Sequence, residues 1–128
     1  MRTPFAVGDS RLAGPAIRAF AQIADAWSLT EQEQSAILGQ SKEVAFASLH
    51  AGVDLHPETF ERISHVLAIY RALHTIFPSR LQADVWIRRP NTAEVFKGNP
   101  ALLLMCSGRL EDLSLVREYL NSQGLAEP

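Results

Sequence analysis

The sequence predicts a mostly α-helical protein, and three features support this fold class. Apolar residues recur at three- and four-residue steps in several segments, as on the buried face of a helix. Thr, Ser or Pro stand where such segments begin, and Gly or Pro where they end. The alternating pattern of β-strands is nearly absent. We therefore expect an N-terminal helix-turn-helix bundle, a long connecting helix and a small C-terminal helical domain.

The first helix is expected to begin at Pro15, because a proline at the first helical position loses no hydrogen bond. Before it, residues 1–14 contain proline and glycine with few periodic apolar residues, so we expect a flexible arm there. The helix should end near Ser28. Its apolar stripe consists of Ile17, Phe20, Ala21, Ala24 and Trp27.

Two short helices should follow. Thr30 and Glu33 form the Thr-x-x-Glu pattern of a capping box, which starts a helix that Gly39 then ends. Ser41 is a suitable cap for a third helix, which stops at Gly52. A short capped helix, a glycine-containing turn and a second helix of this size form the layout of a helix-turn-helix.

In a helix-turn-helix that reads DNA, the second helix lies in the major groove. Its early, outward residues in this chain are Lys42, Glu43 and Phe46, which are the candidate DNA-binding residues. Lys42 is the single cation between Glu31 and Phe60, against five carboxylates, and DNA affinity depends on neutralised phosphates. Direct DNA binding and a scaffold that only packs or dimerises both stay open.

A long helix is expected from Pro57 onward. It should end at Pro78, which would close an N-terminal domain covering residues 15–78. Its apolar residues repeat at helical spacing over about twenty positions. They are Phe60, Ile63, Leu67, Tyr70, Leu73 and Phe77.

The C-terminal region, residues 79–128, should contain three further helices. Ser79 caps the first, which carries Leu81, Val85 and Trp86 and is closed by Pro90. The segment after it, residues 92–97, is predicted to be either a short extended piece or a turn.

Of the other two expected C-terminal helices, the first is short and the last is longer. Asn99 as N-cap and Pro100 at the first position open a helix that stops at Gly108. The last helix should end just before Gly124, with Glu111 and Asp112 in its first turn. Its apolar positions are Leu110, Leu113, Leu115, Val116 and Leu120.

The side-chain chemistry argues against an enzyme or a metalloprotein. Cys106 is alone, so neither an internal disulfide nor a cysteine metal cluster can form. His65 and His74 are two and a half turns apart on one helix and face opposite sides, while His50 and His56 lack a metal-binding spacing. The sequence contains neither a phosphate loop nor a nucleophile motif. We expect no catalysis, no metal and no cofactor.

Composition also limits the partners and the location. The net charge is −2, which is not the strongly basic balance of a dedicated nucleic-acid binder. The N-terminus lacks the apolar core of a signal peptide, and no apolar stretch is long enough for a membrane span. We therefore expect a cytoplasmic protein that does not contact membranes.

Two adjacent arginines, Arg88 and Arg89, stand between Trp86 and the pair Pro90-Asn91. Arginine beside an aromatic ring suits a carboxylate of a protein partner or a phosphate. A solvated helix end also favours cations, because they complement the helix dipole. The sequence alone leaves both interpretations open.

The C-terminal motifs, taken in order, resemble those of a known family. They are Ala83-Asp84-Val85-Trp86, Pro90-Asn91, Gly98-Asn99-Pro100, Ser107-Gly108 and a closing helix. This order resembles the toxin-binding domain of the Xre/MbcA/ParS antitoxins. The upstream helix-turn-helix and the long helix agree with it, so the resemblance covers about Pro15 to Gly124.

The resemblance implies a function. Such antitoxins are encoded beside RES-domain toxins, which consume NAD or transfer ADP-ribose to proteins. The C-terminal domain binds the toxin and obstructs its NAD site. The N-terminal domain dimerises and in many members binds the operon's own promoter DNA, and the assemblies contain several copies of both chains. A freestanding helix-turn-helix repressor is the alternative.

The resemblance also assigns residues. The positions that match the family's punctuation are Trp86, Pro90, Gly98, Pro100 and Gly108. They are expected to be architectural, with Trp86 and Leu103 in the core. The expected toxin-binding residues are Arg88, Arg89, Asn91, Lys97, Arg117, Glu118, Asn121 and Gln123.

Overall fold

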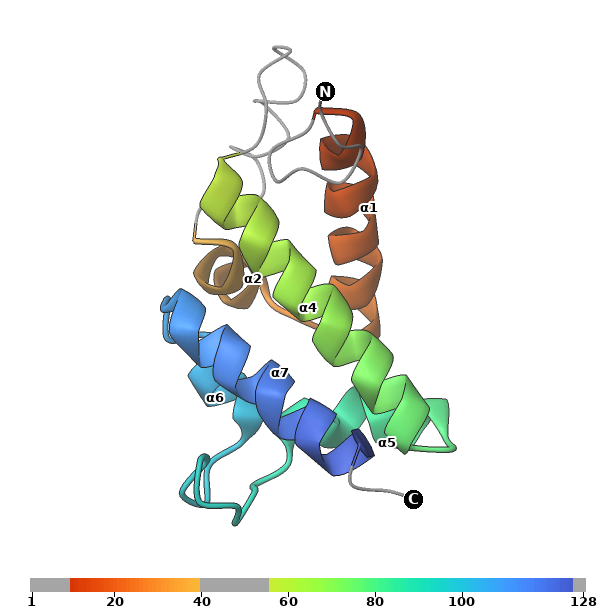
Figure 1. Ribbon diagram of the computed structural model, residues 1–128, viewed down its shortest axis with the longest axis vertical. Coiled ribbons are helices and arrows are strands. Elements are labelled where there is room, and N and C mark those ends of the chain that lie inside the picture. Colours follow the sequence, from red (N-terminus) through yellow and green to blue (C-terminus); the bar gives the residue numbers. More distant parts are fainter. Residues whose placement is uncertain (1–9, 40–55, 126–128) are drawn as a thin grey trace. The chain divides into compact units, whose positions relative to one another are not determined.

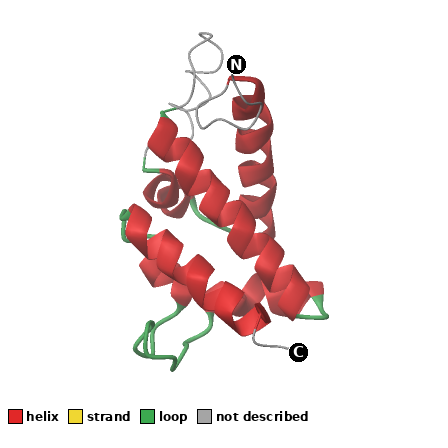
Figure 2. Cartoon of the chain, in the orientation of Figure 1, coloured by secondary structure: helices red, strands yellow, loops and turns green. Residues whose placement is uncertain are grey.

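The computed structural model of the chain describes residues 10–39 and 56–125, and within those ranges it is helical without a strand (Figures 1 and 2). The predicted mostly α-helical fold is confirmed. The predicted third helix lies outside the described residues, as do residues 1–9 of the arm and the candidate DNA-binding residues Lys42, Glu43 and Phe46.

The chain divides into two compact units, Met1–Ser64 and His65–Pro128. The boundary lies inside helix α4 (Pro57–Ile76), so the long helix contributes to both units. Units defined by packing need not coincide with units of function, and the domain division after residue 78 stays a prediction.

In the first unit, helix α1 (Ser10–Ala26) begins before Pro15, so the predicted start at this proline was wrong. Proline removes one backbone hydrogen bond inside a helix, but the preceding Leu12 and Ala13 are good helix formers. The predicted stripe is confirmed at its main positions. Ile17, Phe20, Ala24 and Trp27 are buried.

Helix α2 (Glu31–Leu38) has the caps that the sequence predicts. The Thr30 Oγ1 accepts a hydrogen bond from the Glu33 N–H at 3.0 Å, and the Thr30 N–H donates to the Glu33 carboxylate at 2.9 Å. Gly39 ends the helix with φ at +79°, a left-handed conformation that glycine adopts without a steric penalty. The capping box and the glycine stop are both confirmed.

Arg62 joins α4 to the end of α2 and is buried, which no local sequence pattern predicts. Its side chain donates to the Glu58 carboxylate at 2.7 and 3.0 Å and to the Ile37 carbonyl at 3.3 Å. The last carbonyls of a helix lack partners within it, so this bond satisfies one of them. A methyl group at Gly39 would lie 3.0 Å from the Arg62 Nε, so the turn also needs glycine for space.

The buried stripe of α4 differs in part from the predicted one. Ile63 and Leu73 are fully buried as expected, but Val66 and Ile69 are buried where Leu67 and Tyr70 were expected, and the latter two are half-buried. The two sets are one residue apart along the helix. Because both are apolar at helical spacing, only the packed neighbours decide which one faces the core.

The second unit contains α5 (Arg80–Val85), one turn of 3₁₀-helix η1 (Trp86–Arg88), α6 (Ala101–Met105) and α7 (Leu110–Leu125). The Ser79 hydroxyl caps α5 by accepting a hydrogen bond from the Gln82 N–H at 3.3 Å, as predicted. The core of this unit includes Ile69, Leu73, Ala83, Ile87, Phe96, Ala101, Met105, Leu113, Val116 and Leu120.

Three details of the second unit correct the predictions. Leu81 is 72% exposed, because Ala83 and Ile87 form the buried side of this segment instead. The N-cap of α6 is Pro100, without a capping side chain, so Asn99 does not cap it. Helix α7 continues through Gly124, because a single glycine lowers helix stability by only about 1 kcal/mol.

No helix in the described part of the chain is both long and apolar enough to cross a membrane.

Candidate functional site

The loop between η1 and α6, residues 90–100, closes on itself at its two ends. Pro90 and Pro100 form an antiparallel bridge, the Gly98 N–H donates to the Asn91 carbonyl at 2.8 Å, and the Asn91 N–H donates to the Asn99 carbonyl at 3.3 Å. Residues 94–98 form turns, which settles the open choice for residues 92–97 against an extended piece. The loop is therefore held as a defined projection between two helices.

Asn91 and Lys97 take part in the shape of this loop. The Asn91 Oδ1 accepts a hydrogen bond from the Ala93 N–H at 2.9 Å, which is the typical turn made by an asparagine side chain. Lys97 has φ at +53° and Gly98 has φ at +86°, so the reversal passes through two left-handed residues. The Lys97 side chain is exposed at the tip of the turn.

Three aromatic side chains form a cluster at the base of the loop, and we refer to Trp86, Phe96 and Tyr119 as the aromatic cluster. The rings of Trp86 and Tyr119 are stacked with centroids 6.3 Å apart. Phe96 packs edge-on against both, at 5.8 Å from Trp86 and 5.1 Å from Tyr119. The cluster ties η1, the loop and α7 together, and edge-to-face pairs add about 0.5–1.5 kcal/mol beyond their buried area.

The aromatic cluster refines the predicted core. Trp86 is half-buried, so its ring is partly in the core and partly displayed. Leu103 was wrongly expected in the core and is 62% exposed, because α6 buries Ala101, Leu102 and Met105 on its other side. Sequence reasoning missed Tyr119, although it lies three residues after Val116 on the buried stripe of the same helix.

The two predicted arginines lie beside this cluster. Arg88 and Arg89 are both exposed at the end of η1. Arg89, Pro90, Asn91 and Trp86 line a shallow open pocket with a volume of about 280 Å³. The structure thus brings Arg89 and Asn91, two of the predicted contact residues, together beside the half-buried indole ring of Trp86.

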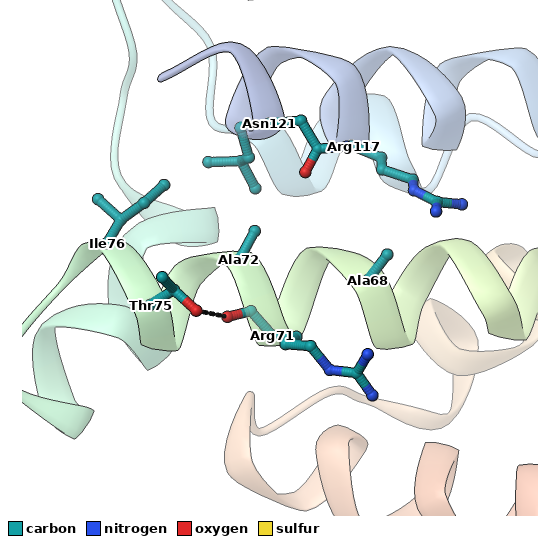
Figure 3. Close-up of a pocket in the computed structure, with 8 residues that line it drawn as sticks. Ala68, Arg71, Ala72, Thr75, Ile76, Arg117 and Asn121 are labelled. Atoms are coloured by element: carbon teal, nitrogen blue, oxygen red, sulfur yellow. Dashed lines mark hydrogen bonds between the residues drawn. The ribbon is translucent and has the colours of Figure 1, made fainter. Parts of the chain in front are cut away.

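The predicted contact residues of α7 fall into a second group. Arg117 and Asn121 line a groove between α7 and the C-terminal half of α4 (Figure 3). The Arg117 Nη1 lies 3.3 Å from the His65 Nδ1. Glu118 and Gln123 are exposed, and the Glu118 carboxylate accepts a hydrogen bond from the Ser114 hydroxyl at 3.3 Å. Neither of these two lines the pocket at Trp86 or the groove.

The histidines in the described residues each contact a neighbouring group of the fold. The His74 Nε2 lies 2.9 Å from the Asp84 carboxylate and its ring packs on Tyr70 at 4.2 Å, which joins α4 to α5. The His56 Nδ1 accepts a hydrogen bond from the Glu58 N–H at the start of α4. The Cys106 side chain is half-buried. In the ranges that the structure describes, no three His, Cys, Asp or Glu residues gather as a metal site requires.

Charge is displayed unevenly on the second unit. Its exposed cations are Arg71, Arg80, Arg88, Arg89, Lys97 and Arg109, against three exposed carboxylates among the described residues, Glu94, Glu111 and Glu118. The Asp84 and Asp112 carboxylates are mostly covered, with 14% of each side chain exposed. Such a surface favours a partner that presents carboxylates, because complementary charges steer association and fix the orientation of the complex.

Comparison with known proteins agrees with this picture of a docking domain. Residues 72–123 match the family model described as the antitoxin Xre/MbcA/ParS C-terminal toxin-binding domain. Over 116 residues the chain is 40% identical to the uncharacterized protein y4oB of Sinorhizobium fredii (strain NBRC 101917 / NGR234). The aligned region covers 90% of this chain and 88% of that protein. The matched residues 72–123 contain the aromatic cluster, Arg88 and Arg89, and the predicted contact residues of α7.

Proposed function

Since this chain belongs to the Xre/MbcA/ParS antitoxin family, whose C-terminal toxin-binding domain it carries at residues 72–123, we propose that it is the antitoxin of a type II system that neutralises a RES-domain, NAD-consuming toxin. The antitoxin binds the toxin and occludes its active site. Occlusion needs buried area and shape fit, and no catalytic group of the antitoxin takes part.

The family match carries the proposal, and the surface of the second unit supports it. Arg88 and Arg89 are exposed next to Trp86, and interfaces concentrate their binding energy in arginine and aromatic side chains. The aromatic cluster fixes the backbone on which these side chains stand. A prearranged surface loses less conformational entropy on binding than a flexible one.

The experiment that tests the proposal is co-expression with the product of the adjacent gene. The neighbour alone should deplete cellular NAD and stop growth, and the pair should grow with normal NAD and purify as one complex. Failure to form a complex together with failure to restore NAD would refute the antitoxin function. Stoichiometry can be measured on the same complex by light scattering.

Removing the Arg88 and Arg89 side chains is expected to weaken the complex while the fold survives. The variant Arg88→Ala with Arg89→Ala should raise the Kd of toxin binding by about thirtyfold, which corresponds to about 2 kcal/mol of lost contact energy. The matched control is Arg80→Ala with Arg109→Ala, two other exposed arginines of the same unit. Equal affinities in all three proteins would show that Arg88 and Arg89 are only a solvated helix end.

We also propose that the first unit dimerises and represses the antitoxin's own operon. The observation in favour is α2 with its capping box and left-handed Gly39, which match the first helix and turn of a helix-turn-helix. A freestanding repressor would use the same unit, and it differs in having no toxin partner.

DNA binding by this unit should depend strongly on salt, because released counterions drive it. We expect the chain to retard its own promoter DNA at low salt and to lose about tenfold or more in affinity when the salt concentration is raised fourfold. Lys42→Ala should weaken binding, whereas Arg80→Ala in the second unit should not. Absence of a gel shift at low salt would contradict a repressor function.

A further inference from the structure

The α4–α7 groove is a second concave feature of the second unit, and it lies apart from Arg88, Arg89 and the aromatic cluster. It is an open depression of about 330 Å³ between the C-terminal half of α4 and the late turns of α7. Ala68, Ala72, Ile76 and Leu120 supply its apolar surface, and Arg71, Arg117 and Asn121 also belong to its lining. Figure 3 shows Ala68, Ala72 and Arg117 between α4 and α7, whereas the side chain of Arg71 is directed away from α7. It is separate from the pocket beside Trp86, because the two share no residue.

Two alanines keep the groove open. Ala68 and Ala72 are one helical turn apart and therefore lie on the same face of α4. A larger side chain at either position would fill the space that faces α7. The apolar surface left in the groove is larger than the polar surface, so it suits an apolar side chain of a partner rather than a hydrated ion.

The charged groups of the groove have a single sign. Arg71 and Arg117 belong to its lining, and no carboxylate does. Arg71 is exposed, whereas Arg117 is half-buried with its guanidinium 3.3 Å from the His65 ring. The Thr75 hydroxyl donates to the Arg71 backbone carbonyl at 2.9 Å, so this hydroxyl is directed toward the backbone of α4 and not into the groove. The cations are thus the main polar determinants of what binds here.

We propose that the α4–α7 groove is a second docking site for the toxin and that it receives a segment with an apolar side chain flanked by carboxylates. The apolar side chain rests on Ala68, Ala72 and Leu120, and the carboxylates pair with Arg117 in the groove and with the exposed Arg71 at its edge. This inference rests on the proposed antitoxin function. The toxin is the occupant because the groove residues from Ala72 to Asn121 lie within the matched toxin-binding domain.

The test uses the full-length chain and the purified product of the adjacent gene, with Kd measured by titration calorimetry. Arg71→Glu reverses a charge on an exposed side chain and should raise the Kd about tenfold or more. Ala72→Trp should fill the groove and raise the Kd by a similar factor. The control is Arg80→Glu, an exposed charge reversal on α5 outside the groove, which should bind like the wild type.

Folding is checked by the thermal melt of each variant. Arg71→Glu is expected to melt like the wild type because its side chain is exposed, so it decides the question even where Ala72→Trp is destabilised. The salt dependence gives a second readout. Affinity of the wild type should fall more steeply with salt than affinity of Arg71→Glu, because the variant has lost an attractive ion pair.

The outcomes separate the two proposals. If the wild type binds the toxin and Arg71→Glu binds with the same Kd, the groove proposal is refuted while the antitoxin function stands. If the wild type does not bind the toxin, the antitoxin function fails and this occupant fails with it. If Arg71→Glu instead changes the oligomeric state of the antitoxin alone in light scattering, the groove is a contact between two copies and our assignment is overturned.

Discussion

Replacement of Trp86 by alanine is expected to lower the free energy of unfolding of the C-terminal unit by about 3 kcal/mol. Loss of a large aromatic side chain from a packed site typically has an effect of about 3–5 kcal/mol, and the half-buried position of Trp86 places it at the lower end. The loss includes both ring contacts, at 5.8 Å to Phe96 and 6.3 Å to Tyr119. Urea unfolding followed by far-UV circular dichroism measures it.

The same substitution should also weaken toxin binding, because the aromatic cluster supports the loop and the segment that carries Arg88 and Arg89. Trp86→Phe is the control that keeps an aromatic ring, and it should lose only about 1 kcal/mol. Leu103→Ala removes an exposed side chain and should be nearly neutral for stability. A small loss of stability with abolished binding would show instead that Trp86 is an anchor of the interface.

Replacement of Trp27 by alanine should destabilise the N-terminal unit by about 4 kcal/mol. Trp27 is 1% exposed at the end of α1, so its removal leaves a large cavity in the core of that unit. The chain has two tryptophans, so in this variant Trp86 alone reports by fluorescence on the C-terminal unit. The midpoint measured by circular dichroism should fall more than the midpoint measured by fluorescence.

That difference follows from the two compact units, each with its own buried residues. Trp27→Phe is the control, because it keeps most of the buried volume. It should lose less than half of the unfolding free energy that Trp27→Ala loses. Equal shifts of both midpoints would show that the units unfold as one cooperative body. A shift near zero would contradict the assignment of Trp27 to the core.

Local signals predicted the helices well where one residue decides the backbone. Thr30, Glu33 and Gly39 fix the bounds of α2, and Ser79 fixes the start of α5, because a cap acts on N–H and C=O groups within the same turn. The end at Gly124 was not predicted correctly, because glycine only weakens a helix and packing of the preceding turns overrides it.

Burial was predicted less well, because it depends on neighbours that are distant in sequence. Val66 and Ile69 are buried in place of Leu67 and Tyr70, and Leu103 is exposed although its neighbours on α6 are buried. Arg62 is buried because the Ile37 carbonyl lies within reach, 25 positions away along the chain. No local pattern contains that information.

The candidate site shows the same division. Exposed arginines beside a tryptophan could be identified from the sequence, and so could the family from the order of Trp, Pro and Gly. The grouping of the contact residues could not, because Arg89 and Asn91 lie beside Trp86 while Arg117 and Asn121 face α4.

The sequence by itself determined the helical class, the caps and the antitoxin family, because these depend on residue types at short or fixed spacing. Only the tertiary structure decided that Tyr119 stacks on Trp86 and that α4 and α7 leave a groove with two arginines. The physical reason is that a helix determines which of its own residues share a face. Which of those faces meets another helix, and which remains open for a partner, is set by the packing of the whole unit.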